Sequence, residues 1–292
     1  MYTYNCEGTI AMATQKQGRV RISLLVYLTI ILAALALWVT SNVAMLSAII
    51  FPAHVAERSV TSVTTGTNTI SHKLVHYLFF NGNGSYGLVS ANQKLNVRQF
   101  SIVFWTKSDG PTHSSFDRPI QMLQWIRTSG GLWIPYGWAF DADNQTKVGI
   151  DKLRFTVGNT LGNLYITYPV TVPRNSWTHI VGTFDGKTLD LYQNGALVGE
   201  FPFRGPYSYH NPPIPIQLAV GWQPHHYWTG DLSDIRIYGR PLSLFEISSI
   251  FHGQDISNGL IGWWKLTEGS GNSIGDSSGN GNNGLIHGAI WK

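Results

Sequence analysis

Three short β-prone runs follow one another in RNSWTHIVGTFDGKTLDLYQ (Arg174–Gln193), NG (Asn194-Gly195) and ALVGE (Ala196–Glu200). Asp185-Gly186 separates the first run from the second, and Asn194-Gly195 separates the second from the third. Asn-Gly accepts positive φ at both central positions, which suits a two-residue type I′ hairpin that matches the twist of the strands. The stretch therefore predicts an antiparallel meander.

The first of these runs has apolar side chains on both faces. Trp177, His179 and Val181 alternate on one face, and Ile180 and Phe184 lie on the other. A strand at the edge of a sandwich does not need two apolar faces. We therefore expect this strand to lie inside a two-layer stack of sheets, with Trp177 and Phe184 buried on opposite faces.

Motifs before, within and after the meander resemble the strands of laminin-G-like domains, which have the concanavalin A-type jelly roll. In chain order these motifs are Phe80–Tyr86, Phe100–Lys107, Trp177–His179, Phe184–Gly186, Leu191–Gly195, Gly230–Tyr238 and Arg240–Ile247. The resemblance covers about three quarters of the chain. It implies an all-β fold, a two-sheet antiparallel jelly-roll sandwich, but not a particular ligand, because this fold has many functions.

The composition agrees with one sizeable β-rich domain plus an appendage. The chain has 292 residues, 43% hydrophobic content, 31 glycines, 11 tryptophans and only 12% charged residues. No basic run follows Arg21, so nucleic acid is not an expected partner. The single cysteine, Cys6, excludes an intramolecular disulfide and a cysteine-based zinc site.

Residues 22–51 contain no charged residue. This segment is longer than the roughly 20 residues that cross a hydrocarbon core, and longer than the apolar region of a cleaved signal peptide, about 7–15 residues. Weak cleavage sites near Ala44 keep a signal peptide as the alternative. We expect one transmembrane helix in the lipid bilayer. The basic residues before it place the amino terminus in the cytoplasm and the jelly roll in an extracellular or lumenal space or within a virion.

The expected organisation has four parts. A cytoplasmic tail (residues 1–21) precedes the transmembrane helix (22–51), a Ser/Thr-rich spacer (52–71) and the jelly-roll domain (72–292). The spacer has an alternative interpretation as a β-arm that packs on a neighbouring copy.

The carboxyl-terminal segment 259–292 resembles the beginning of a typical family member. It contains Gly259–Leu266, Asp276–Gly284 and Ala289–Trp291. A shortened second repeat is one interpretation. We favour a permuted arrangement, because an isolated hairpin buries too little surface to be stable. The strands of this tail would then occupy the sheet positions ahead of Phe80, either in the same chain or in a neighbouring copy.

Catalytic residues are not evident. Jelly-roll glycosidases carry a pair of carboxylates on one strand, whereas Glu200, Glu246 and Glu268 lie in three unrelated segments. Asp141 and Asp143 could share one face of a strand, but a solvated turn is the favoured interpretation. Ser243 and Glu246 instead form a capping-box pattern for a short helix that ends near Phe251. We expect the protein not to be an enzyme.

One loop offers oxygen ligands to a metal. Asp276, Asn280 and Asn282 alternate with glycine and serine, a composition that suits Ca²⁺. The alternative is a glycine-rich turn whose side chains bond to their own backbone. Calcium is therefore the one cofactor that the sequence suggests.

Aromatic residues suggest a sugar-binding surface, because their ring faces pack on sugar C–H groups. The candidates fall in two segments, Trp133, Tyr136 and Trp138 in one and Trp222, Tyr227 and Trp228 in the other. Burial in the core, or against another protein chain, is the alternative for both segments. The remaining tryptophans considered, Trp105, Trp177 and Trp264, are expected in the core. Asn83 and Asn144 are candidate glycosylation sites.

The sequence predicts a single-pass membrane protein that displays one laminin-G-like jelly roll and binds a carbohydrate or glycoprotein. The alternative is a structural subunit of a membrane-associated assembly, such as a virion, in which the jelly roll contacts copies of itself or other proteins.

Overall fold

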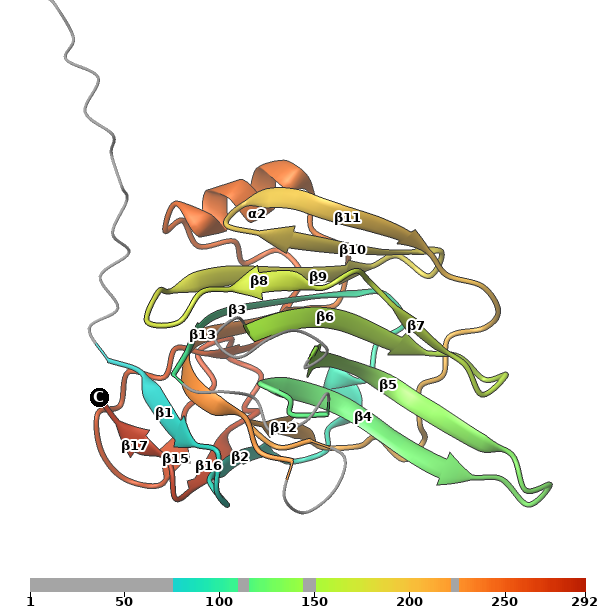
Figure 1. Cartoon of the computed structure of the whole chain (residues 1–292), viewed down its shortest axis with the longest axis horizontal. Coiled ribbons are helices and arrows are strands. Elements are labelled where there is room, and N and C mark those ends of the chain that lie inside the picture. The colour runs from blue at the N-terminus through green and yellow to red at the C-terminus, as the bar shows by residue number, and fades with distance from the viewer. Residues whose placement is uncertain (1–75, 110–115, 144–150, 222–225) are drawn as a thin grey trace, which may run out of the picture. The chain divides into compact units, whose positions relative to one another are not determined.

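The computed structural model describes residues 76–109, 116–143, 151–221 and 226–292. In this part of the chain two antiparallel β-sheets pack face to face (Figure 1). The predicted fold class, an all-β jelly-roll-like sandwich, is confirmed. No helix among these residues combines the length and the hydropathy needed to cross a bilayer. The predicted tail, transmembrane helix and spacer (residues 1–71) lie outside the described residues.

The first sheet is built around the predicted meander. Its described strands, in spatial order, are β11 (Ala196–Pro202), β10 (Thr188–Gln193), β9 (Thr178–Phe184), β3 (Phe100–Ser108), β13 (Thr229–Tyr238), β1 (Leu78–Asn81) and β17 (Ile290–Trp291), and β14 (Leu260–Trp264) also pairs with β13. Asn194 and Gly195 have φ of 50° and 81°, as a type I′ turn requires. The predicted hairpin between β10 and β11 is therefore confirmed.

The second sheet covers one face of the first. Its described strands, in spatial order, are β15 (Ser273–Ile274), β16 (Gly284–His287), β2 (Tyr86–Val89), β12 (Ile216–Leu218), β4 (Ile120–Arg127), β5 (Trp133–Ala142), β6 (Asp151–Gly158) and β7 (Leu164–Ile166), and β8 (Val170–Val172) also pairs with β6. A short 3₁₀ helix, η1 (Gln93–Leu95), follows β2.

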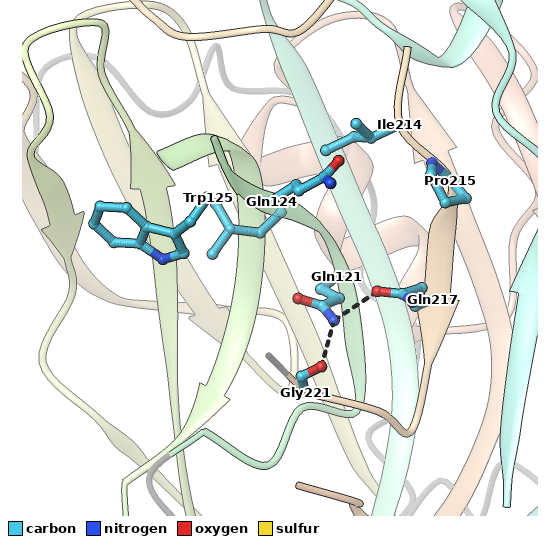
Figure 2. Close-up of a pocket in the computed structure, with 8 residues that line it drawn as sticks. Gln121, Gln124, Trp125, Ile214, Pro215, Gln217 and Gly221 are labelled. Carbon is cyan, nitrogen blue, oxygen red and sulfur yellow. Dashed lines mark hydrogen bonds between the residues drawn. The ribbon is translucent and has the colours of Figure 1, made fainter. Parts of the chain in front are cut away.

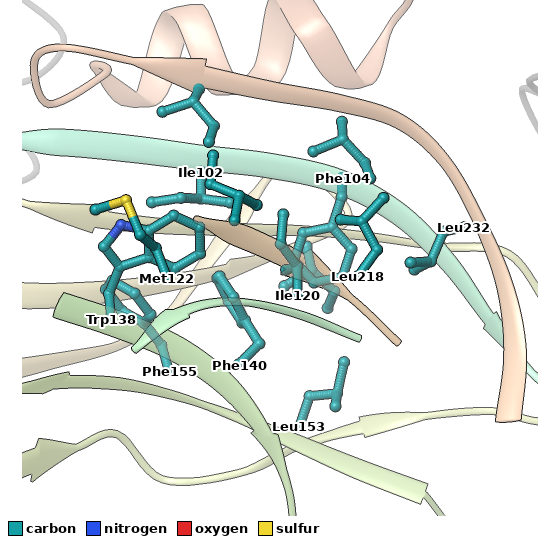
Figure 3. Packing of buried hydrophobic residues seen from close by; sticks show 14 of the residues in the cluster. Ile102, Phe104, Ile120, Met122, Trp138, Phe140, Leu153, Phe155, Leu218 and Leu232 are labelled. Atoms are coloured by element: carbon teal, nitrogen blue, oxygen red, sulfur yellow. The ribbon is translucent and has the colours of Figure 1, made fainter. Parts of the chain in front are cut away.

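The core lies between the sheets and is rich in aromatic side chains (Figure 3). The ring of Phe140 packs edge-on against Phe104, with 4.9 Å between centroids, and stacks on Phe155 at 5.0 Å. Gly182 of β9 faces these rings. A Cβ atom there would lie 2.8 Å from the Phe140 ring and 2.9 Å from the Phe155 ring. Glycine at this position therefore allows the two sheets to approach each other.

The outer face of the first sheet is covered by helix α2 (Leu244–Phe251). Val103 and Val181 pack there with Ile247 and Ile250 of the helix. β9 thus has one face in the main core and the other under α2, and it lies between β10 and β3 in the sheet. This confirms that the strand is inside the stack and not at its edge.

Trp177 corrects one expectation about the core. It lies just before β9 and is only half-buried. Its ring packs edge-on against Tyr77 at 5.1 Å, and Lys107 Nζ lies 5.4 Å from its centroid. Phe184 is fully buried on the opposite face. The alternation of faces was predicted correctly, but the burial of Trp177 was not, because the residue lies beyond the cover that α2 provides.

The tail pairs with strands of the same chain in both sheets. β14 pairs with the second half of β13, beside the half that pairs with β1, and β17 pairs with β1. β16 pairs with β2 in the second sheet. The tail also contributes four buried side chains to the core, namely Trp264, Leu266, Ile274 and Ile286.

Helix α2 begins with the predicted capping box. Ser243 Oγ accepts the amide of Glu246, and Glu246 Oε2 accepts the amide of Ser243 at 2.9 Å. Glu246 also receives two hydrogen bonds from the guanidinium of Arg240, at 2.5 and 3.0 Å. These bonds, those from Arg240 above all, hold the pKa of Glu246 at about 2, below its usual value of 4.5.

This low pKa predicts a pH-dependent contribution to stability. A carboxylate whose pKa is lower in the folded state stabilises the protein above its unfolded pKa, and this contribution is lost as the pH falls through the folded pKa. We expect Glu246→Gln, which retains a capping side chain, to lower the free energy of unfolding above pH 4.5. The difference from wild type should shrink towards pH 2 in urea denaturation. A difference that stays constant between pH 5 and pH 2 would show that the charge of Glu246 is not involved.

Candidate ligand-binding site on the second sheet

The candidate site lies on the outward face of β4. Side chains alternate along a strand, and Ile120 and Met122 belong to the core between the sheets. Gln121, Leu123 and Trp125 therefore point away from the core. β5 and β12 flank β4 in the sheet and extend the same face on either side.

The first hollow on this face has a volume of about 370 Å³, and we call it the amide hollow (Figure 2). Its lining combines three glutamines with apolar and backbone groups: Gln121, Gln124, Gln217, Leu123, Trp125, Ile214, Pro215 and Gly221. Figure 2 shows the amide of Gln121 directed at Gln217 and Gly221, whereas Trp125 lies on the far side of Gln124.

The second hollow has a volume of about 530 Å³, and we call it the aromatic hollow. Its lining is Phe116, Arg118, Trp125, Trp133 and Leu164. Phe116 and Trp133 are exposed, the latter by 52%. Both hollows fall within the size range of small-molecule sites, about 300–1,000 Å³. Because Trp125 lines both of them, they form one continuous surface.

A chain of buried polar groups lies beneath both hollows. Arg118, only 2% exposed, donates from Nε to Asp141 Oδ1 and from Nη1 to Gln121 Oε1 at 2.5 Å. Thr156 Oγ1 donates to Asp141 Oδ2 at 2.5 Å. Gln121 Nε2 in turn donates to Gln217 Oε1 at 2.8 Å. The charge of Arg118 is thus balanced by Asp141, and the floor is held rigidly by hydrogen bonds.

Asp141 corrects a second expectation. The solvated turn predicted around Asp141 and Asp143 is not present at Asp141, which lies within β5 and is buried. Asp143 follows the strand, with one carboxylate oxygen 4.0 Å from Nη1 of Arg154. A buried carboxylate is retained here because Arg118 and Thr156 satisfy both of its oxygens.

The aromatic residues predicted to bind a ligand are separated by the structure. Trp133 lies in the aromatic hollow, but Trp138 is 1% exposed and Trp228 is fully buried, and both belong to the core. Neither ring can stack on a ligand, so the prediction is wrong for these two. Trp133 and Trp138 are five positions apart on β5, and an odd separation places them on opposite faces.

Tyr136 and Tyr227 are not among the lining residues of either hollow. Tyr136 is half-buried and packs edge-on against His210 at 4.9 Å. Tyr227 is half-buried and forms a β-bridge with Val220. Trp222 lies outside the described residues.

Sequence reasoning missed Trp125, Phe116, Arg118 and Gln121. The signal for two of them was the alternation in Ile120-Gln121-Met122, which places Gln121 and Trp125 on the face opposite Met122. No local signal marked Arg118 or Phe116, because their roles depend on contacts with β5 and with the loop before β13.

The predicted calcium loop is closed by its own hydrogen bonds. Asp276 Oδ1 accepts the amides of Trp263 and Ser278, and Oδ2 accepts the amide of Asn282, all at 2.9 Å. Burial opposes ionisation of Asp276, but these hydrogen bonds outweigh it and lower its pKa. Asn280 Nδ2 donates to Ser278 Oγ at 3.1 Å. These hydrogen bonds are the ones expected for the alternative interpretation, a glycine-rich turn whose side chains bond to their own backbone. Calcium binding at this loop stays a prediction.

The described residues show no grouping of three or more His, Cys, Asp or Glu side chains with the geometry of a metal site. Of the two candidate glycosylation sites, Asn83 is exposed in the turn between β1 and β2. Asn144 lies outside the described residues.

Comparisons with known proteins support the fold. A family model described as the concanavalin A-like lectin/glucanases superfamily (Laminin_G_3) matches residues 81–248, more than half of the chain. No curated protein matches the chain.

Solved structures share the fold at low sequence identity. A candidate carbohydrate-binding protein from Bacteroides ovatus is 17% identical, with a TM-score of 0.53, over 74% of this chain and 59% of its own. This chain thus spans about three fifths of that protein. A heptameric SAP-like pentraxin from Limulus polyphemus is 16% identical, with a TM-score of 0.44, over 72% of this chain and 94% of its own.

A third structure is domain 4 of the arabinanase AbnA from Geobacillus stearothermophilus, in complex with arabinotriose. It is 17% identical, with a TM-score of 0.43, over 60% of this chain and 75% of its own. The motifs, the two-sheet topology and the family match lead to one conclusion: the chain belongs to the concanavalin A-like lectin/glucanase superfamily, in its laminin-G-like family.

Proposed function

We propose that this protein is a non-catalytic module that binds carbohydrate on the outward face of β4, β5 and β12. The observation that carries the proposal is the pair of adjoining hollows, which share Trp125 and whose lining includes the buried, charge-balanced Arg118. A site of this kind is already organised before a ligand arrives, so little ordering entropy is lost on binding.

The chemistry of the lining suits a sugar. Aromatic ring faces, such as those of Trp125 and Trp133, pack on the C–H groups of a sugar ring. A sugar hydroxyl both donates and accepts a hydrogen bond, and a glutamine amide does the same through Nε2 and Oε1. The glutamines of the amide hollow therefore match hydroxyl groups.

The arrangement of carboxylates supports binding without hydrolysis. Glycoside hydrolysis uses two carboxylates that flank the scissile bond. Neither hollow has a carboxylate among its described lining residues. Asp141 lies beneath the floor with both oxygens engaged by Arg118 and Thr156.

One sequence motif of hydrolases does occur in the chain. Gly271–Gly275 has the pattern Gly-x-Ser-x-Gly. Its serine, Ser273, lies in the two-residue strand β15, which pairs with β16. A nucleophile elbow requires a sharp turn from a strand into a helix, so this segment does not support hydrolysis either.

We further propose that residues 22–51 anchor the module in a bilayer, with the jelly roll on the extracellular or lumenal side. The charge-free length of this segment and the basic residues before it support the anchor and its orientation. Protease treatment of sealed vesicles should leave the jelly roll protected inside. Release of the full chain by alkaline carbonate would contradict the anchor.

Trp125→Ala should weaken glycan binding strongly, because it removes the wall that both hollows share. We expect a loss of at least tenfold, which corresponds to about 1.4 kcal/mol. The measurement is binding of the full chain to an array of neutral and acidic glycans, with near-ultraviolet circular dichroism to verify folding. Phe245→Ala is the matched control, because Phe245 is 79% exposed on α2, a helix that covers the other sheet. Equal binding by wild type and Trp125→Ala would refute the proposed site.

A second candidate function, contact with another protein in an assembly, is favoured by exposed apolar side chains at two neighbouring turns. Leu132 is 49% exposed before β5, and Leu161 is 61% exposed before β7. The turn at Gly162 packs against Leu132 and Trp133. Sedimentation of the full chain separates the two functions: a mass that falls when Leu132 and Leu161 are both replaced by serine, together with no binding to any glycan, would favour assembly.

A further inference from the structure

The two hollows differ in chemistry but meet at one side chain. Trp125 lines both, and Arg118 of the aromatic hollow donates a 2.5 Å hydrogen bond to Gln121 of the amide hollow. The linings of the two hollows are therefore joined by a buried hydrogen bond as well as by the shared side chain of Trp125. A ligand that contacts both hollows must pass over this ring, which requires a chain of at least two units.

The amide hollow presents hydrogen-bonding groups to the ligand. The amide of Gln121 is already used by Gln217 Oε1 and the carbonyl of Val220, each at 2.8 Å. Gln217 Nε2 donates no hydrogen bond to the described residues, and the side chain of Gln124 is exposed. These two side chains offer uncharged donors and acceptors, the pattern that hydroxyl groups satisfy.

The aromatic hollow presents almost only carbon. Phe116, Trp125, Trp133 and Leu164 form its walls. Its charged residue, Arg118, is buried and balanced by Asp141, so the hollow offers no free positive charge at its floor. A carboxylate placed here would lose its hydration without gaining a counter-ion, which is costly.

Arg127 is an exposed cation on the same face that could favour an acidic ligand instead. It lies opposite Trp133 in the pairing of β4 with β5, at the outer end of the site. Its side chain is exposed, donates to the Gly131 carbonyl at 3.4 Å, and lines neither hollow. Solvent and salt screen an exposed charge of this kind, so the neutral lining dominates the choice of ligand.

We infer that the site takes an uncharged oligosaccharide of two or more units that lies across Trp125, with the hydroxyl groups of one unit in the amide hollow and the carbon face of the next in the aromatic hollow. This inference rests on the proposed function and adds to it the length, the charge and the orientation of the ligand.

The test measures the affinity of the full chain by calorimetry for oligosaccharides of one to six units built from glucose, mannose or galactose. Each hexasaccharide is also measured after oxidation at C6, which adds carboxylates to the same chain. We expect affinity in the series that binds to rise at least tenfold from one unit to three and then to level off. The oxidised hexasaccharide should bind at least tenfold more weakly than its parent.

Two variants assign the units to the two hollows. Trp133→Ala should abolish most of the gain with chain length, and Gln217→Leu should weaken every member of the series. Phe245→Ala should change neither the gain in affinity with chain length nor the affinity for any member of the series. Trp133 is 52% exposed, so its replacement is not expected to impair folding.

The outcomes distinguish this inference from the proposed function. A single sugar that binds as tightly as the hexasaccharide refutes the two-unit arrangement, and an oxidised chain that binds as well as its parent refutes the preference for uncharged sugars. In both cases carbohydrate binding at the site stands. Binding that Trp125→Ala leaves unchanged, or no binding by any series or its oxidised form, refutes both proposals together.

Discussion

Asp141→Leu is expected to destabilise the protein by about 3–5 kcal/mol, because it leaves the guanidinium of Arg118 buried without its counter-charge. Arg118 is 2% exposed and donates to Asp141 through Nε. Thr156 loses its acceptor in the same substitution. Denaturation of the full chain in urea, followed by tryptophan fluorescence, measures the free energy of unfolding.

The control for this prediction removes both charges. Arg118→Met combined with Asp141→Leu leaves no buried charge, and such replacements of a buried pair are often neutral or stabilising. We expect the double variant to be more stable than Asp141→Leu alone. If Asp141→Leu lowers the free energy of unfolding by less than about 1 kcal/mol, water must reach the guanidinium of Arg118.

Deletion of residues 259–292 is expected to abolish the folded state of the sandwich. It removes four buried apolar side chains, Trp264, Leu266, Ile274 and Ile286, together with the strands paired to β13, β1 and β2. Loss of one large buried side chain costs about 2–5 kcal/mol, and the whole stability of a typical domain is about 5–15 kcal/mol. Near-ultraviolet circular dichroism and limited proteolysis measure the loss.

Two adjacent residues of β16 provide a milder version of the same test. Ile286 is 6% exposed and belongs to the core, whereas Leu285 is 65% exposed on the opposite face. Ile286→Ala should lower the free energy of unfolding by about 2–5 kcal/mol, and Leu285→Ala should lower it by less than about 0.5 kcal/mol. Equal effects, or a truncated chain that stays soluble and unfolds cooperatively, would show that the tail is not part of the sandwich.

Much of the fold could be predicted because its signals are local. Asn194-Gly195 forms the expected hairpin because few other residue pairs accept φ of 50° and 81° in succession. Asp185 closes the preceding turn by accepting the amides of Lys187 and Thr188 at 2.7 Å. Ser243 and Glu246 start α2 by bonding to each other's backbone. Each of these features depends on a few neighbouring residues.

The site was harder to predict because it depends on which strands cover which faces. Trp133 and Trp138 lie in one aromatic-rich run, yet one lines the aromatic hollow and the other fills the core. Asp141 resembles a turn residue until Arg118, 23 positions earlier, is placed beside it. Trp177 follows the alternation of β9 but extends past the residues that α2 covers. Contacts between distant segments decide all three cases.

The central claim, that carbohydrate binds across Trp125 on the outward face of β4, is tested most directly by footprinting. Hydroxyl-radical oxidation of the full chain is compared with and without the neutral hexasaccharide that binds best. The account predicts that the ligand protects Trp125 and Trp133, and that Phe245 on α2 is oxidised equally in both samples. Protection of Phe245, with Trp133 oxidised as before, would contradict the claim.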